Sequence, residues 1–276
     1  MTQNEGAEPL IDTTRPQIAR VYDFLLGGRD NYPVDRQFGI LLEEDSPIVV
    51  QLARENRYFL RRVVGYLADE AGIDQFVDIG SGLPTQENVH EVAQNANPNA
   101  RVVYVDNDAL VLAHARALLA TDERTGIVSG DMLAPGAIID HPVTRELIDF
   151  SRPVAVLLVS VLHFADDPDR ALNGWREVMA TGSRLVISHG EDDPRIERAT
   201  AHYRQALKVG VARTREEIAS MFTGLELVDP GLVPVPDWRP ELARIDSTVA
   251  TLPIGAAIDT TMDKLPMLGA VGRVPS

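Results

Sequence analysis

The sequence contains no cysteine, which excludes disulfide bonds, thiolate metal sites and cysteine nucleophiles. The six histidines are scattered, and neither an H-x-x-x-H nor an H-E-x-x-H pair is present, so the helical metal-binding patterns are missing too. Ser81 lies between two glycines, but the spaced G-x-S-x-G motif of serine hydrolases is absent. We therefore predict neither a metal site nor a nucleophile triad.

The chain also lacks long apolar runs and an excess of basic residues. No stretch approaches the roughly 20 uncharged apolar residues that cross a bilayer, and residues 1–12 are too polar for a signal peptide. Acidic residues outnumber basic ones by 41 to 26, which gives a net charge of −15 that repels phosphate backbones. We expect a cytoplasmic protein whose partners include neither a membrane nor a nucleic acid.

The most informative stretch combines two apolar runs with a glycine turn. The first run, Phe76–Ile79, includes Asp78 and is followed by Gly80-Ser81-Gly82; the second run, residues 101–106, ends at Asp106. Glycines admit a ligand close to the backbone, and an acid at the end of the next strand can accept the hydroxyls of a ribose. The pattern is typical of a nucleotide-type binding crossover.

The dinucleotide fingerprint G-x-G-x-x-G begins in the same way. Here Thr85 occupies the position of its third glycine and Pro84 precedes it. This difference weakens the case for a pyrophosphate ligand, and the rival interpretation as a nicotinamide-dependent oxidoreductase stays open at this point.

The first third of the chain predicts helices joined by a polar loop. Helical spacing runs from residue 14 to residue 25 and ends at the Gly27-Gly28 pair, and a long amphipathic helix begins with Ser46 as its cap and ends before Gly72. Between them, residues 29–36 suit either a ligand-contacting loop or a solvated turn equally well.

Polar residues mark the long helix. Asn56 interrupts the apolar stripe, and a polar group satisfied at the edge of the core is favoured over one that reaches a ligand. The basic cluster of this helix is interpreted as a solvated face rather than an anion site. Its members are Arg54, Arg57, Arg61 and Arg62.

After residue 72, strand and helix patterns alternate, which predicts a mostly parallel sheet covered by helices on both faces. Strands are expected at residues 76–79, 101–106, 126–129, 154–160, 184–188 and 225–228, and helices at residues 85–96, 109–120, 168–180, 196–207 and 214–222. Residues 233–266 are interpreted as a surface insertion, and residues 267–274 as a seventh strand at the sheet edge.

Four segments together resemble one bacterial family of class I S-adenosylmethionine-dependent methyltransferases, long catalogued as a domain of unknown function. They are residues 19–32 (ARVYDFLLGGRDNY), 78–85 (DIGSGLPT), 88–93 (NVHEVA) and 103–108 (VYVDND). The resemblance implies a Rossmann-like α/β fold with a seven-stranded sheet.

The same resemblance implies a division of the chain and a set of site residues. Residues 1–72 would form a tail and a helical lid, and residues 73–276 the domain that binds S-adenosylmethionine. The implied cofactor-binding residues are Tyr22, Gly28, Asn31, Asp78, Gly80, Ser81, Gly82, Thr85, Asp106, Asn107, Asp131, Met132 and Ser160.

Within this set, the implied roles follow the parts of the cofactor. Asp78 and the glycine turn would surround the methionine moiety, Asp106 would accept both ribose hydroxyls, and three residues would lie by the adenine: Asn107, Asp131 and Met132. Ser160 would face the methyl group, and Tyr22 with residues 27–31 would cover the cofactor.

Tyr22 and His163 are the candidate catalytic residues, His163 as a general base. A lone histidine is more often a packed or capping side chain, so this alternative is kept.

The implied activity is methyl transfer from S-adenosylmethionine to a small-molecule acceptor, which leaves S-adenosylhomocysteine. Two other functions share the same residues: an NAD(P)-dependent oxidoreductase, and a non-catalytic module that binds S-adenosylmethionine or S-adenosylhomocysteine.

Overall fold

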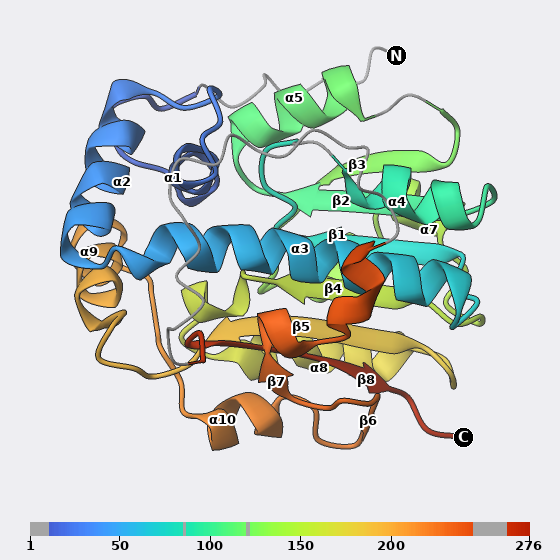
Figure 1. Ribbon diagram of the computed structural model, residues 1–276. Coiled ribbons are helices and arrows are strands. Elements are labelled where there is room, and N and C mark those ends of the chain that lie inside the picture. The colour runs from blue at the N-terminus through green and yellow to red at the C-terminus, as the bar shows by residue number, and fades with distance from the viewer. Residues whose placement is uncertain (1–10, 85–86, 120–121, 245–263) are drawn as a thin grey trace, which may run out of the picture.

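The computed structural model describes residues 11–84, 87–119, 122–244 and 264–276. Its centre is one sheet with the strand order β3-β2-β1-β4-β5-β8-β6, and the two-residue strand β7 pairs with β8 beside this path (Figure 1). The strands are β1 (Gln75–Ile79), β2 (Arg101–Asp106), β3 (Thr125–Ser129), β4 (Ala155–Val159), β5 (Arg184–Gly190), β6 (Glu226–Leu227), β7 (Val233–Pro234) and β8 (Met267–Arg273).

Strands β1 to β5 are mutually parallel, whereas β8 runs antiparallel to β5, β6 and β7. The prediction of a Rossmann-like fold with a mostly parallel seven-stranded sheet is confirmed, with β7 as a short addition. The helices are α1 (Ile18–Leu25), α2 (Pro33–Asp45), α3 (Ile48–Asp69), α4 (Val89–Ala96), α5 (Ala109–Leu118), α6 (Pro135–Ile139), α7 (Pro142–Leu147), α8 (Pro168–Val178), α9 (Glu197–Leu207) and α10 (Arg215–Ser220), with 3-10 turns η1 (Leu162–Phe164), η2 (Val235–Asp237) and η3 (Pro240–Arg244).

The parallel strands are mostly apolar because helices cover both of their faces. In β1, Phe76 joins the core that includes residues of α3 and α4, whereas Val77 and Ile79 join the opposite core with residues of α6 to α8. This alternation follows from the two-residue period of a strand. Because parallel strands end at one edge of a sheet, the residues that follow β1 to β4 gather there.

The loop predicted at residues 29–36 is shorter than expected, because α2 begins at Pro33. The Asp35 carboxylate accepts a hydrogen bond of 2.9 Å from the backbone N–H of Tyr32, which satisfies a donor at the start of the helix. Phe38 and Leu42, one helical turn apart, are buried. The polar composition of the first turn concealed this helix from the sequence-based interpretation.

The expectation that residues 267–274 form an edge strand is wrong, since β8 lies between β5 and β6. Its glycines serve close packing instead. A Cβ on Gly269 would lie 2.7 Å from the ring of Phe59 in α3, and one on Gly272 would lie 2.8 Å from Leu225. Glycine in this strand therefore marks a close approach of neighbouring elements to its backbone.

The interpretation of Arg62 as part of a solvated face is also wrong. Its side chain is buried and donates hydrogen bonds to the carbonyl oxygens of Trp238 (2.9 Å) and Val235 (2.5 Å). These two residues are themselves fully buried, so the described part of the segment 233–266 packs against α3 rather than merely covering the surface. Residues 245–263 lie outside the described residues.

Two helix starts also differ from the prediction. Ser46 does not cap α3, because this helix begins at Ile48. The hydroxyl of Ser46 instead accepts a hydrogen bond of 3.3 Å from the backbone N–H of Ala199. The first crossover helix, α4, begins at Val89 rather than at residue 85. Every helix among the described residues is too short or too polar to cross a membrane.

Helices α1 and α2 form a small core of their own with the start of α3 and with α9. Val21, Leu42, Val49 and Ala199 belong to this cluster. It lies beside the main core, to which α3 also contributes along its whole length, from Ile48 to Ala68. The first helices are thus packed on the sheet domain through α3 and α9 (Figure 1).

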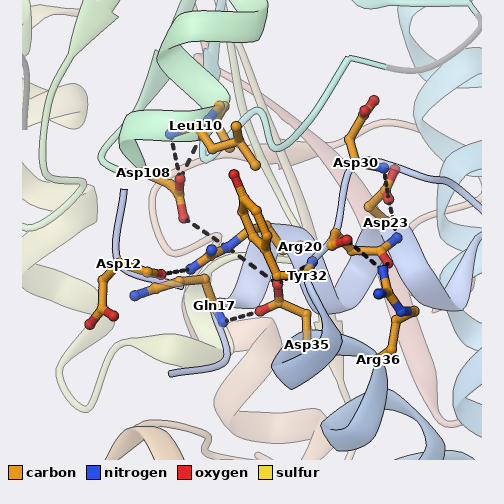
Figure 2. A network of polar contacts seen from close by, with 12 residues as sticks. Asp12, Gln17, Arg20, Asp23, Asp30, Tyr32, Asp35, Arg36, Asp108 and Leu110 are labelled. Atoms are coloured by element: carbon orange, nitrogen blue, oxygen red, sulfur yellow. Dashed lines mark hydrogen bonds and ion pairs between the residues drawn. The ribbon is translucent and has the colours of Figure 1, made fainter. Parts of the chain in front are cut away.

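Arg20 in α1 links this small core to the sheet domain. Its buried guanidinium lies between Asp35 of α2, 3.6 Å from Nε, and Asp108 after β2, 3.8 Å away (Figure 2). Its Nη2 donates to the backbone oxygen of Asp12 at 2.9 Å, and its guanidinium lies 5.3 Å from the ring centre of Tyr32. Through these contacts the buried Arg20 side chain connects α1 with α2 and with the loop after β2.

Candidate functional site

The turn after β1 brings the backbone close to β2. The N–H groups of Gly80 and Ser81 both donate to the carbonyl oxygen of Val105, at 2.8 and 3.1 Å. Gly80 and Gly82 adopt φ angles of +68° and +67°, which side-chain-bearing residues rarely adopt. A Cβ on Gly80 would lie 2.5 Å from Val161, whereas a Cβ on Gly82 would meet nothing within 4 Å.

Asp106 ends β2 and organises the two loops beside it. Its Oδ2 accepts the N–H of Gly82 at 2.9 Å, and its Oδ1 accepts the N–H groups of Asn107 (2.8 Å) and Asp108 (2.9 Å). A carboxylate offers about four lone-pair sites, so one remains here, on Oδ2. The described geometry therefore accommodates one of the two ribose contacts expected for Asp106, and the second stays a prediction.

Asp78 lies in the same turn region and is buried. Burial raises the pKa of its carboxyl to about 7, while the charge of Arg57 on α3 lowers this pKa and that of Asp106 raises it. The arrangement places a carboxyl that ionises near neutral pH and a guanidinium in the lining of one cavity, which suits an amino acid zwitterion.

These groups open onto one cavity of about 280 Å³ at the carboxyl ends of the strands. The size is close to the lower end of the roughly 300–1,000 Å³ range of small-molecule sites. The structure brings together most of the predicted site residues in its lining. These are Tyr22, Asp78, Gly80, Ser81, Gly82, Asp106, Asn107, Asp131, Met132, Ser160 and His163.

Two predicted residues do not line this cavity. The Asn31 amide donates to Asp23 at 2.7 Å and to the backbone oxygen of Gly28 at 3.1 Å. A Cβ on Gly28 would fall 2.0 Å from the Asp23 carboxylate, so this glycine makes room for the acid. Both residues build the loop before α2, and their contact with the cofactor stays a prediction. Thr85 lies outside the described residues.

A chain of hydrogen bonds connects Tyr22 to the end of β4. The Tyr22 hydroxyl donates to the backbone oxygen of Ala53 (2.9 Å) and accepts from the Asn56 amide (3.1 Å). The Asn56 oxygen accepts the hydroxyl of Ser188 (2.6 Å), which in turn accepts the N–H of Ser160 (2.9 Å). Ser160 has a φ of +58°, a conformation that this chain helps to hold.

The same chain informs the roles of Tyr22 and Asn56. Because the Tyr22 hydroxyl proton is already donated to a carbonyl, its ring rather than its hydroxyl is offered to the cavity. Asn56 was predicted to be satisfied at the core edge, and it is, although it also lines the cavity.

His163 lies in η1, directly after β4, and lines the cavity. Its Nδ1 is buried without a hydrogen-bond partner among the described residues. Burial, assisted by His189 and Arg213, lowers the pKa of His163 well below its usual value, so the ring is uncharged at neutral pH. As a proton acceptor it would be weak; as a hydrogen-bonding group it is available.

Arg213 positions the turn that carries His163. Its guanidinium, which is buried, donates to the backbone oxygens of Leu162 (3.2 Å), Ala165 (2.6 Å) and Asp166 (3.1 Å). It also donates to Nε2 of His189 at 2.8 Å. The Nδ1 of His189 in turn donates to the carbonyl oxygen of Gly190. The turn η1 is therefore held from its backbone side.

Sequence reasoning missed several residues of the cavity. Arg57 was assigned to a solvated face, yet it lines the cavity beside Asp78. Phe164, Tyr203 and Val211 were not singled out, because they belong to segments distant in sequence from the glycine turn. The sequence did contain one signal for these residues: Phe164 directly follows His163, which was already a candidate site residue.

Comparisons with known proteins agree with this site. The sequence matches the family model described as S-adenosyl methyltransferase over residues 4–275. The chain belongs to this S-adenosyl methyltransferase family. The resemblance identified from the sequence is thereby confirmed, and the protein is an S-adenosylmethionine-dependent methyltransferase. No curated protein matches the sequence.

Solved structures of this methyltransferase fold are similar over nearly the whole chain. A candidate methyltransferase from Thermobifida fusca YX is 42% identical, with a TM-score of 0.86 and coverage of 96% of this chain and 97% of that one. A DUF574 family protein from Streptomyces avermitilis MA-4680 is 40% identical, with a TM-score of 0.86 and coverage of 96% and 100%.

A more distant structure shares the fold alone. It is the 1,6-didemethyltoxoflavin-N1-methyltransferase of Burkholderia thailandensis with bound 1,6-didemethyltoxoflavin and S-adenosylhomocysteine. It is 18% identical to this chain, with a TM-score of 0.50, and 97% and 99% of the two chains are covered.

The residues of this methyltransferase fit its cofactor, S-adenosylmethionine. The missing Cβ of Gly82 leaves space at the turn, and Oδ2 of Asp106 retains one lone-pair site for a hydroxyl. Asp78 and Arg57 carry the two charges that complement an amino acid. A diphosphate would instead face the carboxylates of Asp78 and Asp106, so the geometry gives no support to the oxidoreductase alternative.

Proposed function

We propose that this enzyme methylates a small-molecule acceptor. The observation that carries the proposal is one continuous cavity, which extends from the glycine turn and the charged side chains near it to an uncharged wall formed by α9 and η1. A cavity of about 280 Å³ suits a small molecule rather than a folded macromolecule. The net charge of −15 also repels nucleic acids.

In this proposal each part of S-adenosylmethionine has its own residues. Asp78 holds the amino group and Arg57 the carboxylate, while the backbone of residues 80–82 lies against the methionine chain. Asp106 accepts a ribose hydroxyl. The adenine is held by Asn107, Asp131 and Met132.

The remaining predicted residues would surround the reacting end and cover the cofactor. Ser160 and His163 would face the methyl group, with Tyr22 above them. Thr85, Gly28 and Asn31 would support the turn and the cover. We further propose that α1 and α2 act as a lid, because the small core that they form with α9 lies beside the cavity lining of Tyr22 and Tyr203.

The cofactor supplies an activated methyl group on a positively charged sulfur. The protein aligns the acceptor lone pair with the methyl carbon, and it excludes water through the apolar lining. In the transfer, the acceptor would form a bond to the methyl carbon while the carbon–sulfur bond breaks, and the electron pair of that bond would stay on sulfur. A proton on the acceptor atom leaves to water or to His163, and an acceptor that carries none needs no base.

A thermal-shift comparison tests the proposed cofactor. We expect S-adenosylmethionine and S-adenosylhomocysteine at about 100 times Kd to stabilise the protein by about 2.7 kcal/mol, whereas NADH at the same concentrations produces no shift. Stabilisation by NADH alone would contradict the site assignment. Turnover of an identified acceptor separates the enzyme from a binding module.

The pKa of Asp78 predicts how cofactor binding depends on pH. Burial raises this pKa to about 7, so the carboxylate that pairs with the amino group is fully ionised only above that pH. Between pH 5.5 and 7.5 we expect affinity for S-adenosylmethionine to rise with pH, by up to tenfold per unit below pH 7, as measured by calorimetry.

Two variants isolate the contribution of Asp78 to this slope. Asp78→Asn should bind weakly at every pH and lose most of the slope, because it carries no titrating carboxylate. Asp169→Asn on the exposed start of α8 is the control and should retain the wild-type slope. A flat wild-type profile across pH 7 would refute the assignment.

A further inference from the structure

The cavity of this enzyme is divided by charge. The charged side chains in its described lining are those of Arg57, Asp78, Asp106, Asp108 and Asp131. The four acids lie in or directly after β1, β2 and β3, and Arg57 lies beside Asp78. The proposed cofactor occupies this side.

The other side of the cavity, over β4 and β5, is lined by uncharged side chains. They come from α1, the first half of α3, η1, α9 and the loop at residues 210–212. Most are apolar; the polar ones are Tyr22, Asn56, His163, Thr200 and Tyr203, together with Ser160 directly after β4. A charged acceptor buried there would find no side chain of opposite charge among the described residues on this side of the cavity, at a desolvation cost of several kcal/mol.

Aromatic rings form the floor of this uncharged side. The ring centre of Phe164 lies 4.3 Å from that of His163 and 5.5 Å from that of Tyr203, and Tyr203 packs edge-on against Phe38 at 5.4 Å. Phe164, His163 and Tyr203 also line the cavity. Edge and face contacts with such rings favour a planar aromatic ligand over a saturated one of equal size.

Two polar groups flank Phe164. The Tyr203 hydroxyl has no hydrogen-bond partner among the described residues, in contrast to Tyr22, whose hydroxyl both donates and accepts. Burial raises the pKa of Tyr203 and lowers the pKa of His163, so both groups are uncharged at neutral pH. They offer hydrogen bonds without charge.

The loop at residues 210–212 fixes this arrangement. The N–H of Val211 donates to the backbone oxygen of His163 at 2.8 Å, and the Arg204 side chain donates to the backbone oxygen of Gly210 at 2.7 Å. The loop thereby ties η1 to α9, the two elements that carry Phe164 and Tyr203. The aromatic floor is held in place before any acceptor binds.

We propose that the methyl acceptor is an uncharged, planar aromatic molecule that lies against Phe164 and hydrogen-bonds to Tyr203 and His163. This inference rests on the proposed function and names the class of its acceptor. The acceptor atom is a hydroxyl oxygen or a ring nitrogen, because both carry a lone pair on an otherwise neutral molecule.

Binding of four probes of matched size tests the proposal. Protein saturated with S-adenosylhomocysteine is titrated by calorimetry with 2-naphthol, its saturated analogue 2-decalol, anionic 2-naphthoate and cationic 2-naphthylmethylammonium, each up to about 1 mM. We expect 2-naphthol to bind at least about tenfold more tightly than each of the other three, which corresponds to 1.4 kcal/mol.

Variants connect this preference to the named residues. Tyr203→Phe should weaken 2-naphthol binding about fivefold through loss of one neutral hydrogen bond. Phe164→Leu should reduce the preference for 2-naphthol over 2-decalol. Tyr58→Phe, on the exposed face of α3, is the matched control and should behave like the wild type. Unchanged binding of S-adenosylhomocysteine shows that each variant is folded.

The outcomes separate this inference from the function on which it rests. If S-adenosylhomocysteine fails to bind the wild-type protein, the proposed cofactor site is refuted. If it binds, but a charged or saturated probe binds as tightly as 2-naphthol, or no probe binds, the inference of an uncharged aromatic acceptor is overturned.

Discussion

Replacing Asp106 with alanine is expected to weaken binding of S-adenosylmethionine by about 100-fold or more. A hydrogen bond to a charged group contributes about 1.5–3 kcal/mol, and the ribose contact that we propose for Asp106 would be of this kind. The change also leaves the N–H groups of Gly82, Asn107 and Asp108 without their acceptor. The two loops that shape the cofactor site then lose their common anchor.

Calorimetry with S-adenosylmethionine and S-adenosylhomocysteine measures this loss of affinity. Two further variants serve as a conservative replacement and as a control. Asp106→Asn keeps the size of the side chain, but its amide nitrogen cannot accept a hydrogen bond, so it should also bind weakly. Asp192→Ala removes an exposed acid outside the cavity lining and should bind normally. An Asp106→Ala protein that is folded and binds both compounds like the wild type would contradict the proposed ribose contact.

The second large effect concerns stability. Arg20→Met is expected to lower the free energy of unfolding by about 3–5 kcal/mol, because the buried carboxylate of Asp35 then loses the cation that lies next to it. Asp35 is fully buried and accepts the N–H groups of Gln17 and Tyr32, both at 2.9 Å. Its negative charge is therefore built into the start of α1 and α2, and Arg20 compensates it.

Urea denaturation compares Arg20→Met with a surface control. Arg145→Met removes the exposed ion pair with Asp140 and should cost under about 1 kcal/mol. Hydrogen exchange adds a local measurement: the amides of α1 and α2 should lose protection before those of the sheet if the small core opens by itself. Equal losses of stability in the two variants would mean that Arg20 contributes only as a surface charge does.

Several elements could be predicted because their signals are local. The boundaries of β2 match the prediction at both ends, since an apolar run bounded by turns is sufficient to define a buried strand. Gly80 and Gly82 were identified because their positive φ angles restrict the choice of residue. The acids near the ends of the first three strands, Asp78, Asp106 and Asp131, were expected at one site, since parallel strands end at one edge of the sheet.

Other features depend on contacts between distant segments. The environment of Arg62 was misjudged because its partners, the backbone oxygens of Val235 and Trp238, lie more than 170 positions away. Backbone acceptors leave no charge pattern in a sequence. Likewise, Gly269 was interpreted as a glycine that an edge strand tolerates. It lies instead in an interior strand, where the missing Cβ makes room for the ring of Phe59 in α3.

Local periodicity and the backbone freedom of single residues were sufficient to predict the alternation of strands and helices, the glycine turn and the position of Asp106 at the end of β2. The set of side chains that share the cavity depends instead on tertiary contacts. Phe164, Tyr203 and Arg57 come from three separate elements, and the packing of α3 and α9 at the strand ends brings them together. Long-range packing of this kind is a property of the folded chain and has no short-range signature.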